Sequence, residues 1–596
     1  MPDLRFSEAE PSDAERLAVD GVVAELGAVV VVEGERLVYA GRARTAERRH
    51  LLLPALHAIQ RTSGWISPGG LDYACRQLEV PPAEAYGVAT FYHLFTHEPP
   101  EATDVVHVCD DIACRPPGAL GLIDELRAAG HNVKASPCLG QCERGPAVLV
   151  QRTGDHDLTI APGSVDGVAV AISGRTSAAS VTLPQAGSPG LRLLARVGVV
   201  DPGSLDDYRA NGGYRALDAA ISMGPDRIIE EVSTSGLSGR GGAAFPTGVK
   251  WRGVADQQGR PRHVVCNADE SEPGTFKDRV VMEGDPFSLV EAMTIAGIAV
   301  GAEQGWVYIR GEYPVATHRL RMAIDQARAA GLLGADVAGS GKRFDIDLRS
   351  GAGAYICGEE TALFNSIEGF RGEPRNKPPF PTTHGLFGEP TAINNVETLL
   401  NVPAIMLDGG EAYRATGTDR SPGTRLFCLS GRVAHPGTYE HEFGITLRGV
   451  LDAAGGVVGA DEPHAVLLGG AAGFFVRSEQ LDLPLTLEDT RAAGVSLGSG
   501  VVMVFGEEDD MVDTVRRVAE FFRDESCGQC VPCRVGTVRQ EEVLARLRDG
   551  ATLDDEVELL DDLAAVMRDA SICGLGQTAS GAIRSALDLG LLEGAR

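Results

Sequence analysis

Residues 525–534, ESCGQCVPCR, place three cysteines in a C-x2-C-x2-C pattern at Cys527, Cys530 and Cys533. The stretch continues a segment with helical spacing, DTVRRVAEFFRD, and a fourth cysteine, Cys573, follows 40 positions after Cys533. Thiolates are soft, anionic ligands that suit the irons of a cluster. Three close cysteines and a remote fourth therefore predict a [4Fe-4S] site on a helical domain. Structural zinc stays an alternative, although zinc sites usually present two C-x2-C pairs.

A second set of four cysteines forms a C-x4-C pair and a C-x3-C pair: Cys109, Cys114, Cys138 and Cys142. The sequence around them alternates a short strand, VVHVC, a helix, ALGLIDELRAAG, and two strands, NVKASPC and PAVLVQ. This order predicts a small α/β domain with the cysteines at its loop tips. The spacing fits a [2Fe-2S] centre, and zinc is again the alternative. The other cysteines are expected to be small buried hydrophobic residues: Cys75, Cys266, Cys357 and Cys428.

Composition and charge restrict the class of protein. The 596 residues carry a formal net charge of -29, with 43% hydrophobic and 23% charged residues. This composition is typical of a globular protein with several domains, and the acidity argues against nucleic acid and anionic membranes as partners. The start, MPDLRFSEAE, lacks a secretory pattern, and no stretch reaches the ~18 apolar residues of a membrane helix. Residues 292–300 come nearest and read as a buried helix.

We therefore expect a cytoplasmic protein that is not inserted in a membrane. The reducing cytosol disfavours disulfides, so grouped cysteines there indicate metal or redox chemistry.

A glycine-rich loop, GLSGRGGAAFPTGVKW, occupies residues 236–251 and contains a G-x-G-x-x-A motif that begins at Gly239. The bare motif is weak evidence, and it follows a helical rather than a strand-like segment, so a standard dinucleotide fold is doubtful. Glycines nevertheless allow close backbone approach, and their N–H groups form a nest for anions. Arg240 and Lys250 add positive charge for a phosphate. A tight structural turn is the alternative.

Two acidic loops complement this basic one. The first, CNADESEPGTFKDR, carries Asn267, Asp269, Glu270 and Glu272, and the second, GAGAYICGEETAL, carries Glu359 and Glu360 after Gly358. Carboxylates accept hydrogen bonds from ribose hydroxyls, carboxamides and flavin ring N–H groups, but they repel phosphate. A basic glycine loop beside acidic loops fits two nucleotides bound side by side. Two solvated acidic turns are the alternative.

Shifts in composition and periodicity predict six segments. They are an N-terminal extension at residues 1–44, a helical plus α/β [2Fe-2S] domain at 45–172, a linker at 173–199, a nucleotide-binding domain at 200–420, a small β-rich domain at 421–505 and a helical [4Fe-4S] domain at 506–596. The linker is rich in Ser, Ala, Gly, Thr and Pro, as flexible connections are.

Together these motifs resemble the NADH-oxidising module of respiratory complex I and its soluble relatives. The resemblance spans residues 45–590 and rests on long matches: GRGGAAFPTGVKW, NADESEPGTFKDR, GAGAYICGEE, KPPFP, INNVET, ESCGQCVPCR and SICGLGQ. Residues 45–172 look like the small [2Fe-2S] subunit and residues 200–590 like the flavin subunit, here fused. The implied fold is α/β multidomain, with a thioredoxin-like [2Fe-2S] domain, a Rossmann-like FMN/NAD domain, a small β-rich ubiquitin-like domain and a C-terminal helical bundle.

The resemblance also implies which residues bind cofactors. FMN is expected at Gly239, Arg240, Gly241, Gly242, Lys250, Asn267, Asp269, Glu270, Gly358, Asn394, Asn395 and Thr398. NAD(H) is expected at Phe245, Glu272, Glu359, Glu360, Lys377 and Phe380, with the two phenylalanines suited to stacking on adenine. Hydride transfer between nicotinamide and flavin requires no catalytic side chain, because that chemistry belongs to the cofactors.

Among relatives, the NAD-dependent molybdenum or tungsten formate dehydrogenases resemble this chain most. Fused subunits, the intact first cysteine set, FFRDESCGQC and MRDASICGLGQ favour them, as does Gly253, where the complex I protein usually has an aromatic residue. The resemblance implies a catalytic partner subunit with further iron–sulfur clusters, in a higher-order hetero-oligomer. The alternatives are an NAD-reducing nickel-iron hydrogenase, a complex I-type NADH:quinone oxidoreductase and a zinc-stabilised nucleotide-binding scaffold without enzyme activity.

Overall fold

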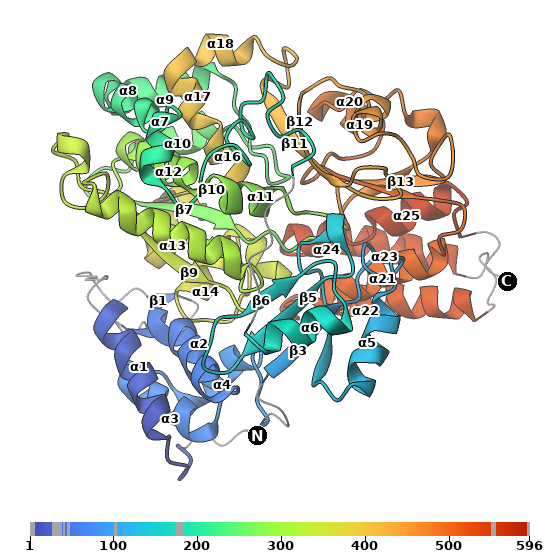
Figure 1. Ribbon diagram of the computed structural model, residues 1–596, viewed down its shortest axis with the longest axis horizontal. Helices are drawn as coiled ribbons and strands as arrows, with labels where there is room; N and C mark the ends of the chain where they lie inside the picture. The colour runs from blue at the N-terminus through green and yellow to red at the C-terminus, as the bar shows by residue number, and fades with distance from the viewer. Residues whose placement is uncertain are drawn as a thin grey trace.

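The computed structural model describes residues 6–26, 38–39, 42–43, 48–99, 104–174, 183–549 and 556–592. The expected extension and linker lie partly outside these ranges. Figure 1 shows the chain running from N-terminal helices through a small α/β domain to a larger domain with a parallel sheet, then to a β-rich domain and C-terminal helices.

The N-terminal region is helical: helices after residue 45 were predicted, whereas the helix within the extension at residues 1–44 was not. Its helices are α1 (Asp13–Leu26), α2 (Leu52–Ser63), α3 (Pro68–Leu78) and α4 (Pro82–Ala89), and a short hairpin of β1 (Val38–Tyr39) and β2 (Arg42–Ala43) precedes α2. Pro68 and Pro82 stand at first helical positions, where a missing N–H costs nothing.

The first cysteine set lies in a small α/β domain. Its sheet has the order β4-β3-β5-β6, with β3 and β4 parallel and the other pairs antiparallel. The elements are β3 (Asp104–Cys109), α5 (Ala119–Ala128), β4 (Val133–Ser136), β5 (Val148–Arg152), β6 (Leu158–Ile160) and α6 (Val165–Ile172). These elements reproduce the strand, helix, strand, strand order that the sequence predicts.

A four-stranded parallel sheet of order β10-β7-β8-β9 forms the centre of the next domain. Its strands are β7 (His263–Ala268), β8 (Gln304–Ile309), β9 (Asp345–Ser350) and β10 (Thr391–Asn395). The surrounding helices are α7 (Leu205–Ala210), α8 (Arg215–Met223), α9 (Pro225–Thr234), α10 (Thr247–Ala255), α11 (Lys277–Gly284), α12 (Pro286–Val300), α13 (Pro314–Ala329), α14 (Glu360–Ile367), α15 (Pro381–His384), α16 (Val396–Leu400), α17 (Val402–Asp408) and α18 (Gly410–Arg414). Because helices cover both faces, β7 and β8 read as nearly continuous apolar runs.

Helix α12 is buried along its whole length. It begins at Pro286 and ends before Gly301. This glycine caps the helix in the left-handed conformation, with φ 69°, which glycine adopts without strain. This confirms that residues 292–300 belong to a buried helix.

The β-rich domain has a five-stranded sheet of order β12-β11-β15-β13-β14. It comprises β11 (Thr424–Gly431), β12 (Gly437–Glu442), α19 (Leu447–Ala453), β13 (Ala465–Leu468), β14 (Phe474–Val476), α20 (Leu487–Ala492) and β15 (Val501–Phe505). The C-terminal helices are α21 (Met511–Asp524), α22 (Val531–Arg548), α23 (Val557–Ala570), α24 (Gly574–Thr578) and α25 (Gly581–Asp588). The predicted fold class is therefore confirmed.

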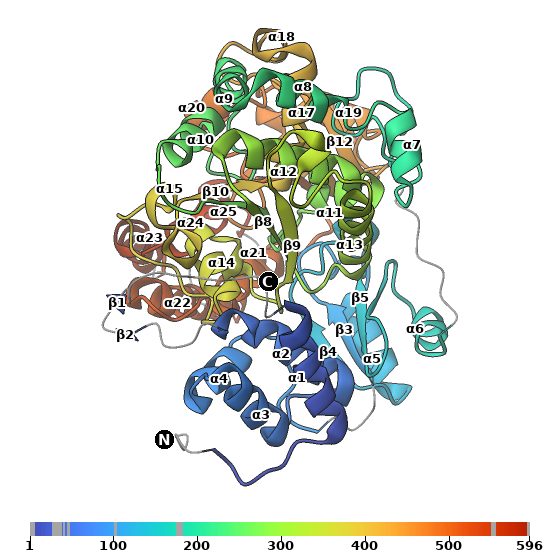
Figure 2. The ribbon, with the colours of Figure 1, turned by 90° about the vertical axis from the view of Figure 1, so that its left-hand side faces the viewer.

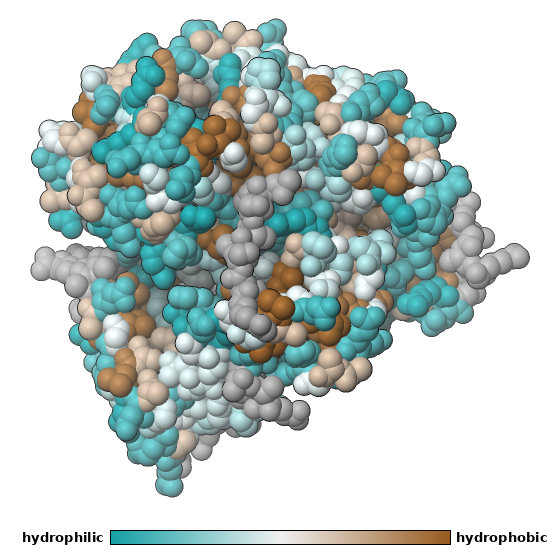
Figure 3. Space-filling view, viewed as in Figure 1, coloured by the Kyte–Doolittle hydropathy of each residue, from teal (hydrophilic) through white to brown (hydrophobic). Residues whose placement is uncertain are grey.

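Both ribbon views place the [2Fe-2S] domain next to the parallel-sheet domain (Figures 1 and 2). The face in Figure 3 is mostly hydrophilic with scattered apolar patches, in keeping with the net charge of -29. Within the described ranges, none of the helices has the length and apolar character needed to cross a membrane.

Candidate flavin, nicotinamide and iron–sulfur sites

Most of the expected flavin residues meet at the carboxyl edge of the parallel sheet. Strand β7 ends at Ala268 and β10 at Asn395, and their register pairs Asn395 with Asn267 and Asn394 with Cys266. Asn267 Nδ2 donates to the Gly358 carbonyl oxygen at 2.8 Å, which ties the loop after β9 to the same edge. Open parallel sheets bind ligands at this edge.

The glycine-rich loop connects α9 to α10 and covers the end of β10. A Cβ on Gly241 would lie 3.1 Å from Asn395 Cβ, and Gly242 adopts φ 108°, so side chains are disfavoured at both positions. The backbone N–H of Arg240 donates to Thr398 Oγ1 at 2.8 Å. The loop is thus held against the sheet edge through backbone contacts.

The Arg240 side chain contradicts the expectation that it faces a phosphate. Its guanidinium is fully buried, donates to Tyr413 Oη at 3.1 Å and to the Pro422 carbonyl oxygen at 2.9 Å, and lies 4.6 Å from the centre of the Phe443 ring. Arg240 therefore anchors the glycine loop from behind. Sequence spacing cannot distinguish this role, because the partners lie far along the chain.

Lys250 is the other basic residue of the loop. Its Nζ donates to the Ile393 carbonyl oxygen at 2.8 Å, and burial lowers its pKa. Trp251 Nε1 donates to Asn394 Oδ1 at 2.9 Å, so α10 and β10 are joined at two points.

Two neighbouring carboxylates after β7 have different environments. Glu270 accepts the backbone N–H groups of Asp278 and Arg279, each at 3.0 Å, at the start of α11. Asp269 Oδ2 is buried and has no hydrogen-bond partner within the described residues, and burial raises the Asp269 pKa well above its ordinary value. An unpartnered buried acceptor at this edge fits a ligand N–H, as a flavin ring supplies.

Glu359 and Glu360 flank one lysine. Glu359 caps α14 by accepting the backbone N–H groups of Thr361 and Ala362. Lys377 Nζ lies 2.9 Å from Glu359 Oε1 and 2.7 Å from Glu360 Oε1, and these carboxylates raise the Lys377 pKa even though burial opposes the shift. The arrangement offers both acceptors and a cation to a nucleotide.

Phe245 and Phe380 are exposed large apolar side chains, at 50% and 58% of their surface. Lys250 Nζ lies 5.9 Å from the centre of the Phe245 ring. Exposed aromatic faces beside charged groups suit a heterocyclic base.

Glu272 links the flavin domain to the β-rich domain. It accepts the Ala472 backbone N–H at 2.9 Å and the Ser499 hydroxyl at 2.8 Å, and burial raises its pKa to about 7. The expected NAD(H) residue is therefore positioned by a domain that contributes none of the sequence-predicted site residues.

The first cysteine set converges in the buried interior. Cys138 Sγ and Cys142 Sγ lie 3.4 Å apart, and hydrogen bonds with Cys114 and Cys138 raise the Cys109 pKa well above its ordinary value. Adjacent thiols resist joint ionisation because their thiolates repel one another, and iron removes that penalty by supplying positive charge. The donor set fits a [2Fe-2S] centre.

The second set lies where two helices begin. Cys530 is the residue before α22, Cys533 lies in its first turn, and Cys573 is the residue before α24. Burial raises the pKa to about 12 for Cys533 and about 11 for Cys573. Helix N-termini favour anionic sulfur, and neighbouring Cys527 completes the four thiols of a [4Fe-4S] site.

Among the described residues, no three His, Cys, Asp or Glu side chains form a group suited to one metal ion. A cluster instead distributes its thiolates over several irons.

Sequence reasoning missed four residues close to these sites. Lys277 lies beside Glu397 in a fully buried ion pair, and the Tyr355 backbone N–H donates to Glu525 at 2.7 Å between the second acidic loop and the C-terminal helices. Lys277 stands within the quoted motif NADESEPGTFKDR, but the motif alone does not indicate a partner 120 positions away.

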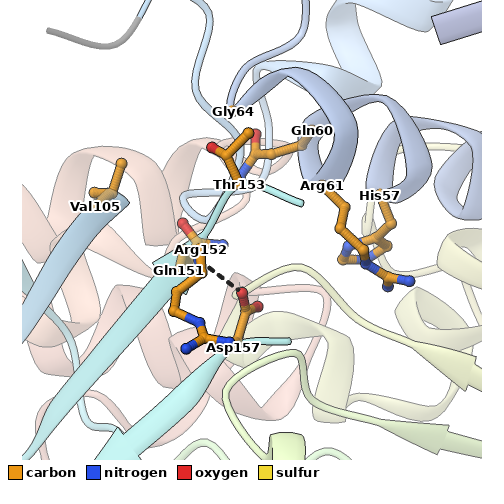
Figure 4. A pocket seen from close by; sticks show the side chains of 9 residues that line it. All are labelled: His57, Gln60, Arg61, Gly64, Val105, Gln151, Arg152, Thr153 and Asp157. Atoms are coloured by element: carbon orange, nitrogen blue, oxygen red, sulfur yellow. Dashed lines mark hydrogen bonds between the residues drawn. The ribbon is translucent and has the colours of Figure 1, made fainter. Parts of the chain in front are cut away.

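A separate cavity of about 50 Å³ lies between α2 and β5 (Figure 4). Its lining includes His57, Arg61, Gln151 and Asp157, and burial lowers the His57 pKa to about 4. None of the sequence-predicted site residues lines it.

Comparison with known protein families matches three consecutive regions. Residues 40–162 match the thioredoxin-like [2Fe-2S] ferredoxin family, residues 232–404 the Nuo51 FMN-binding domain, and residues 513–589 the NADH-ubiquinone oxidoreductase-F iron–sulfur binding region. These matches confirm the expected cofactors FMN, [2Fe-2S] and [4Fe-4S], and they agree with NAD(H) as the substrate.

Two curated relatives align with about two thirds of the chain. The NADP-reducing hydrogenase subunit HndC of Solidesulfovibrio fructosivorans is 45% identical over 67% of this chain and 81% of its own length. An NADH-quinone oxidoreductase subunit of Aquifex aeolicus is 47% identical over 65% of this chain and 89% of its own length.

A solved structure matches the fused architecture. A chain of the NAD+-reducing [NiFe]-hydrogenase in the H2-reduced state has a TM-score of 0.80 and 32% identity, covering 92% of this chain and 93% of that one. This chain therefore belongs to the family of NADH-oxidising diaphorase subunits of complex I and NAD-reducing hydrogenases, with its [2Fe-2S], FMN-binding and [4Fe-4S] regions fused in one polypeptide.

Proposed function

We propose that this chain is the NAD(H)-reacting arm of a soluble formate dehydrogenase. A molybdenum- or tungsten-containing catalytic subunit would supply electrons, and this chain would deliver them to NAD+. The observation that carries the NAD(H) part is the convergence of the glycine loop and both acidic loops at one sheet edge, through the contacts of Asn267 with Gly358 and of Arg240 with Thr398.

The flavin residues bind and orient the ring and phosphate. The glycine loop presents backbone N–H groups to the phosphate, with Lys250 nearby. Asp269 Oδ2, which has no partner among the described residues, would accept a ring N–H. Asn394 and Asn395 would line the same site from the end of β10.

When bound, FMN exchanges a hydride with the nicotinamide and single electrons with the iron–sulfur centres. The chain's own groups act on the nucleotide. Phe245 and Phe380 would receive adenine, Glu359 and Glu360 would accept hydrogen bonds from ribose hydroxyls or the carboxamide, and Lys377 would supply the nearby positive charge. Glu272, held by Ala472 and Ser499, bridges the flavin and β-rich domains.

Sequence features support the formate partner: the fusion, four cysteines in the first set, ESCGQC and Gly253. A Cβ on Gly253 would meet Thr382 at 3.6 Å, so an aromatic residue there would extend beside the turn that carries Phe380. A nickel-iron hydrogenase partner is the second candidate. The match across 93% of a hydrogenase chain supports it.

Native purification with identification of the accompanying subunits and their metal tests the proposal. We expect molybdenum or tungsten and formate-dependent NAD+ reduction. The purified chain alone should oxidise NADH with a dye but neither formate nor hydrogen. Hydrogen-dependent reduction with a nickel-iron pair would move the assignment to the second candidate. A flavin-loaded chain that does not react with NADH would refute the site, and colourless, zinc-containing protein would indicate the scaffold.

A further inference from the structure

Buried Arg310 joins the first cysteine set to the first acidic loop, which carries Asn267 to Glu272. Arg310 directly follows β8 at the carboxyl edge of the parallel sheet. Its Nη2 donates to the Cys138 carbonyl oxygen, and its Nη1 donates to the Glu270 carbonyl oxygen, each at 2.5 Å. Its side chain is only 2% exposed. The guanidinium therefore contacts the backbone of both the first cysteine set and the first acidic loop.

Within the described ranges, Arg310 is directly paired with one countercharge. Its Nη2 lies 2.8 Å from Glu312 Oε1, and that carboxylate is also 2% exposed. His93 Nε2 approaches Glu312 at 3.9 Å, and burial lowers the His93 pKa, so this imidazole favours its neutral form. The Tyr313 ring centre lies 5.0 Å from the guanidinium carbon. Arg310 contacts the cysteine loop directly, whereas Glu312 reaches it through Arg310.

The distance from this charge to the cysteines is set by tight packing. Gly140, between Cys138 and Cys142, adopts φ 65°, and a Cβ there would lie 2.1 Å from Tyr313 Oη. Arg279 Nε also donates to the Gly140 carbonyl oxygen at 2.9 Å. Close-packed interiors resist displacement, so the loop has little freedom to move away from Arg310.

We propose that Arg310 sets the reduction potential of the [2Fe-2S] centre held by the first cysteine set, raising it, and that Glu312 moderates this effect. The inference rests on the assignment of that set as the [2Fe-2S] centre. One-electron reduction would add one unit of negative charge to the iron–sulfur centre that the four cysteines would hold. A fixed buried cation stabilises this added charge, and salt screens buried charges little.

Two substitutions that change the local charge in opposite directions test the proposal through the direction in which each shifts the midpoint potential. In the full chain loaded with FMN and clusters, dithionite and mediator dyes supply the electron, and paramagnetic resonance of the reduced [2Fe-2S] centre gives the midpoint potential. Arg310→Gln should shift it to a more negative value, and Glu312→Gln to a more positive one. Arg310→Lys keeps the charge and should shift it less than Arg310→Gln. Disturbed packing alone does not predict opposite signs.

Arg349→Gln is the matched control. Arg349 is a buried arginine on neighbouring strand β9, 3.5 Å from Asp347 and 5.0 Å from the Trp306 ring centre. Its removal should leave the potential unchanged.

An unshifted potential in Arg310→Gln and Glu312→Gln, with the signal intact, would overturn the inference, as would shifts of equal sign. If Arg310→Gln loses the cluster, Glu312→Gln decides the sign, and a shift to a more negative potential in that variant would overturn the inference. Absence of a [2Fe-2S] signal from the reduced unaltered chain would instead refute the cysteine assignment.

Discussion

Lys277 Nζ lies 2.9 Å from Glu397 Oε2, and the two side chains are 1% and 0% exposed. The same ammonium lies 2.7 Å from Asp278 Oδ1. Glu397 also accepts the Leu426 backbone N–H, at 2.9 Å, at the first strand of the β-rich domain. The buried Lys277–Glu397 ion pair thus connects the start of α11, α16 and the first strand of the β-rich domain.

Lys277→Met should destabilise the chain by about 3–5 kcal/mol, because it leaves two buried carboxylates without their cation. Denaturant unfolding followed by tryptophan fluorescence measures the loss. Exposed Lys342→Met serves as the control and should change stability by no more than about 0.5 kcal/mol. Equal effects of the two substitutions would contradict a structural role for the pair.

Cys530→Ser should retain FMN and NADH-dependent flavin reduction but lose electron exchange with the partner subunit. Cys530 lies beside the start of α22 in the second cysteine set and is not one of the residues expected to hold the flavin. Stopped-flow flavin bleaching and formate- or hydrogen-linked NAD+ reduction separate the two steps. Full linked activity in this variant would disprove that the second set carries electrons out of the flavin site.

Glu360→Gln should chiefly raise the apparent NADH constant. The substitution keeps an acceptor oxygen but weakens the 2.7 Å contact with Lys377, and a lost hydrogen bond costs ~1–3 kcal/mol of binding. Flavin reduction at saturating NADH should be preserved, because no proton transfer at nicotinamide is required. Single-turnover kinetics checks this; a large fall in the saturated rate would assign Glu360 a part in alignment. Exposed Glu303→Gln provides a control that should change neither quantity.

The stability of the Glu272→Gln variant relative to that of the unaltered chain should increase as pH rises from 5 to 8. Burial raises the Glu272 pKa from 4.5 to about 7, so its protonated form favours the folded state. That contribution is complete below pH 4.5 and is lost as pH passes 7, which amounts to about 3 kcal/mol at most. Glutamine has no such loss. Denaturant midpoints of both chains at pH 5 and 8 give the difference; a constant difference would contradict the pKa shift.

Arg115 and Asp513 should couple by about 1 kcal/mol in a double-mutant cycle with Arg115→Gln and Asp513→Asn. Their 2.8 Å ion pair joins the first cysteine domain to α21, with side chains 15% and 25% exposed. The exposed pair Arg568–Asp569 is the control and should show almost no coupling. Raised salt should weaken the first coupling only partly, since both of its side chains are mostly buried.

The cysteine spacing and the glycine and acidic loops could be read from the sequence because they are local patterns. Three ligands within seven positions determine a cluster site wherever the chain folds around them, and strand VVHVC or helix α12 follows from apolar runs and proline or glycine ends. The family, its cofactors and the fold class followed from these stretches alone.

Only the tertiary structure decided which charges face each site. In the sequence, Arg240 lies between Gly239 and Gly241, and this position predicted that its side chain binds a phosphate. In the structure the side chain donates to the carbonyl oxygen of Pro422, 182 positions away. Arg310 reaches Cys138 across 172 positions, and Ser499 reaches Glu272 across 227. Such partners cannot be predicted from local sequence patterns, because a buried polar side chain hydrogen-bonds to a group that is near in space and can lie anywhere in the sequence.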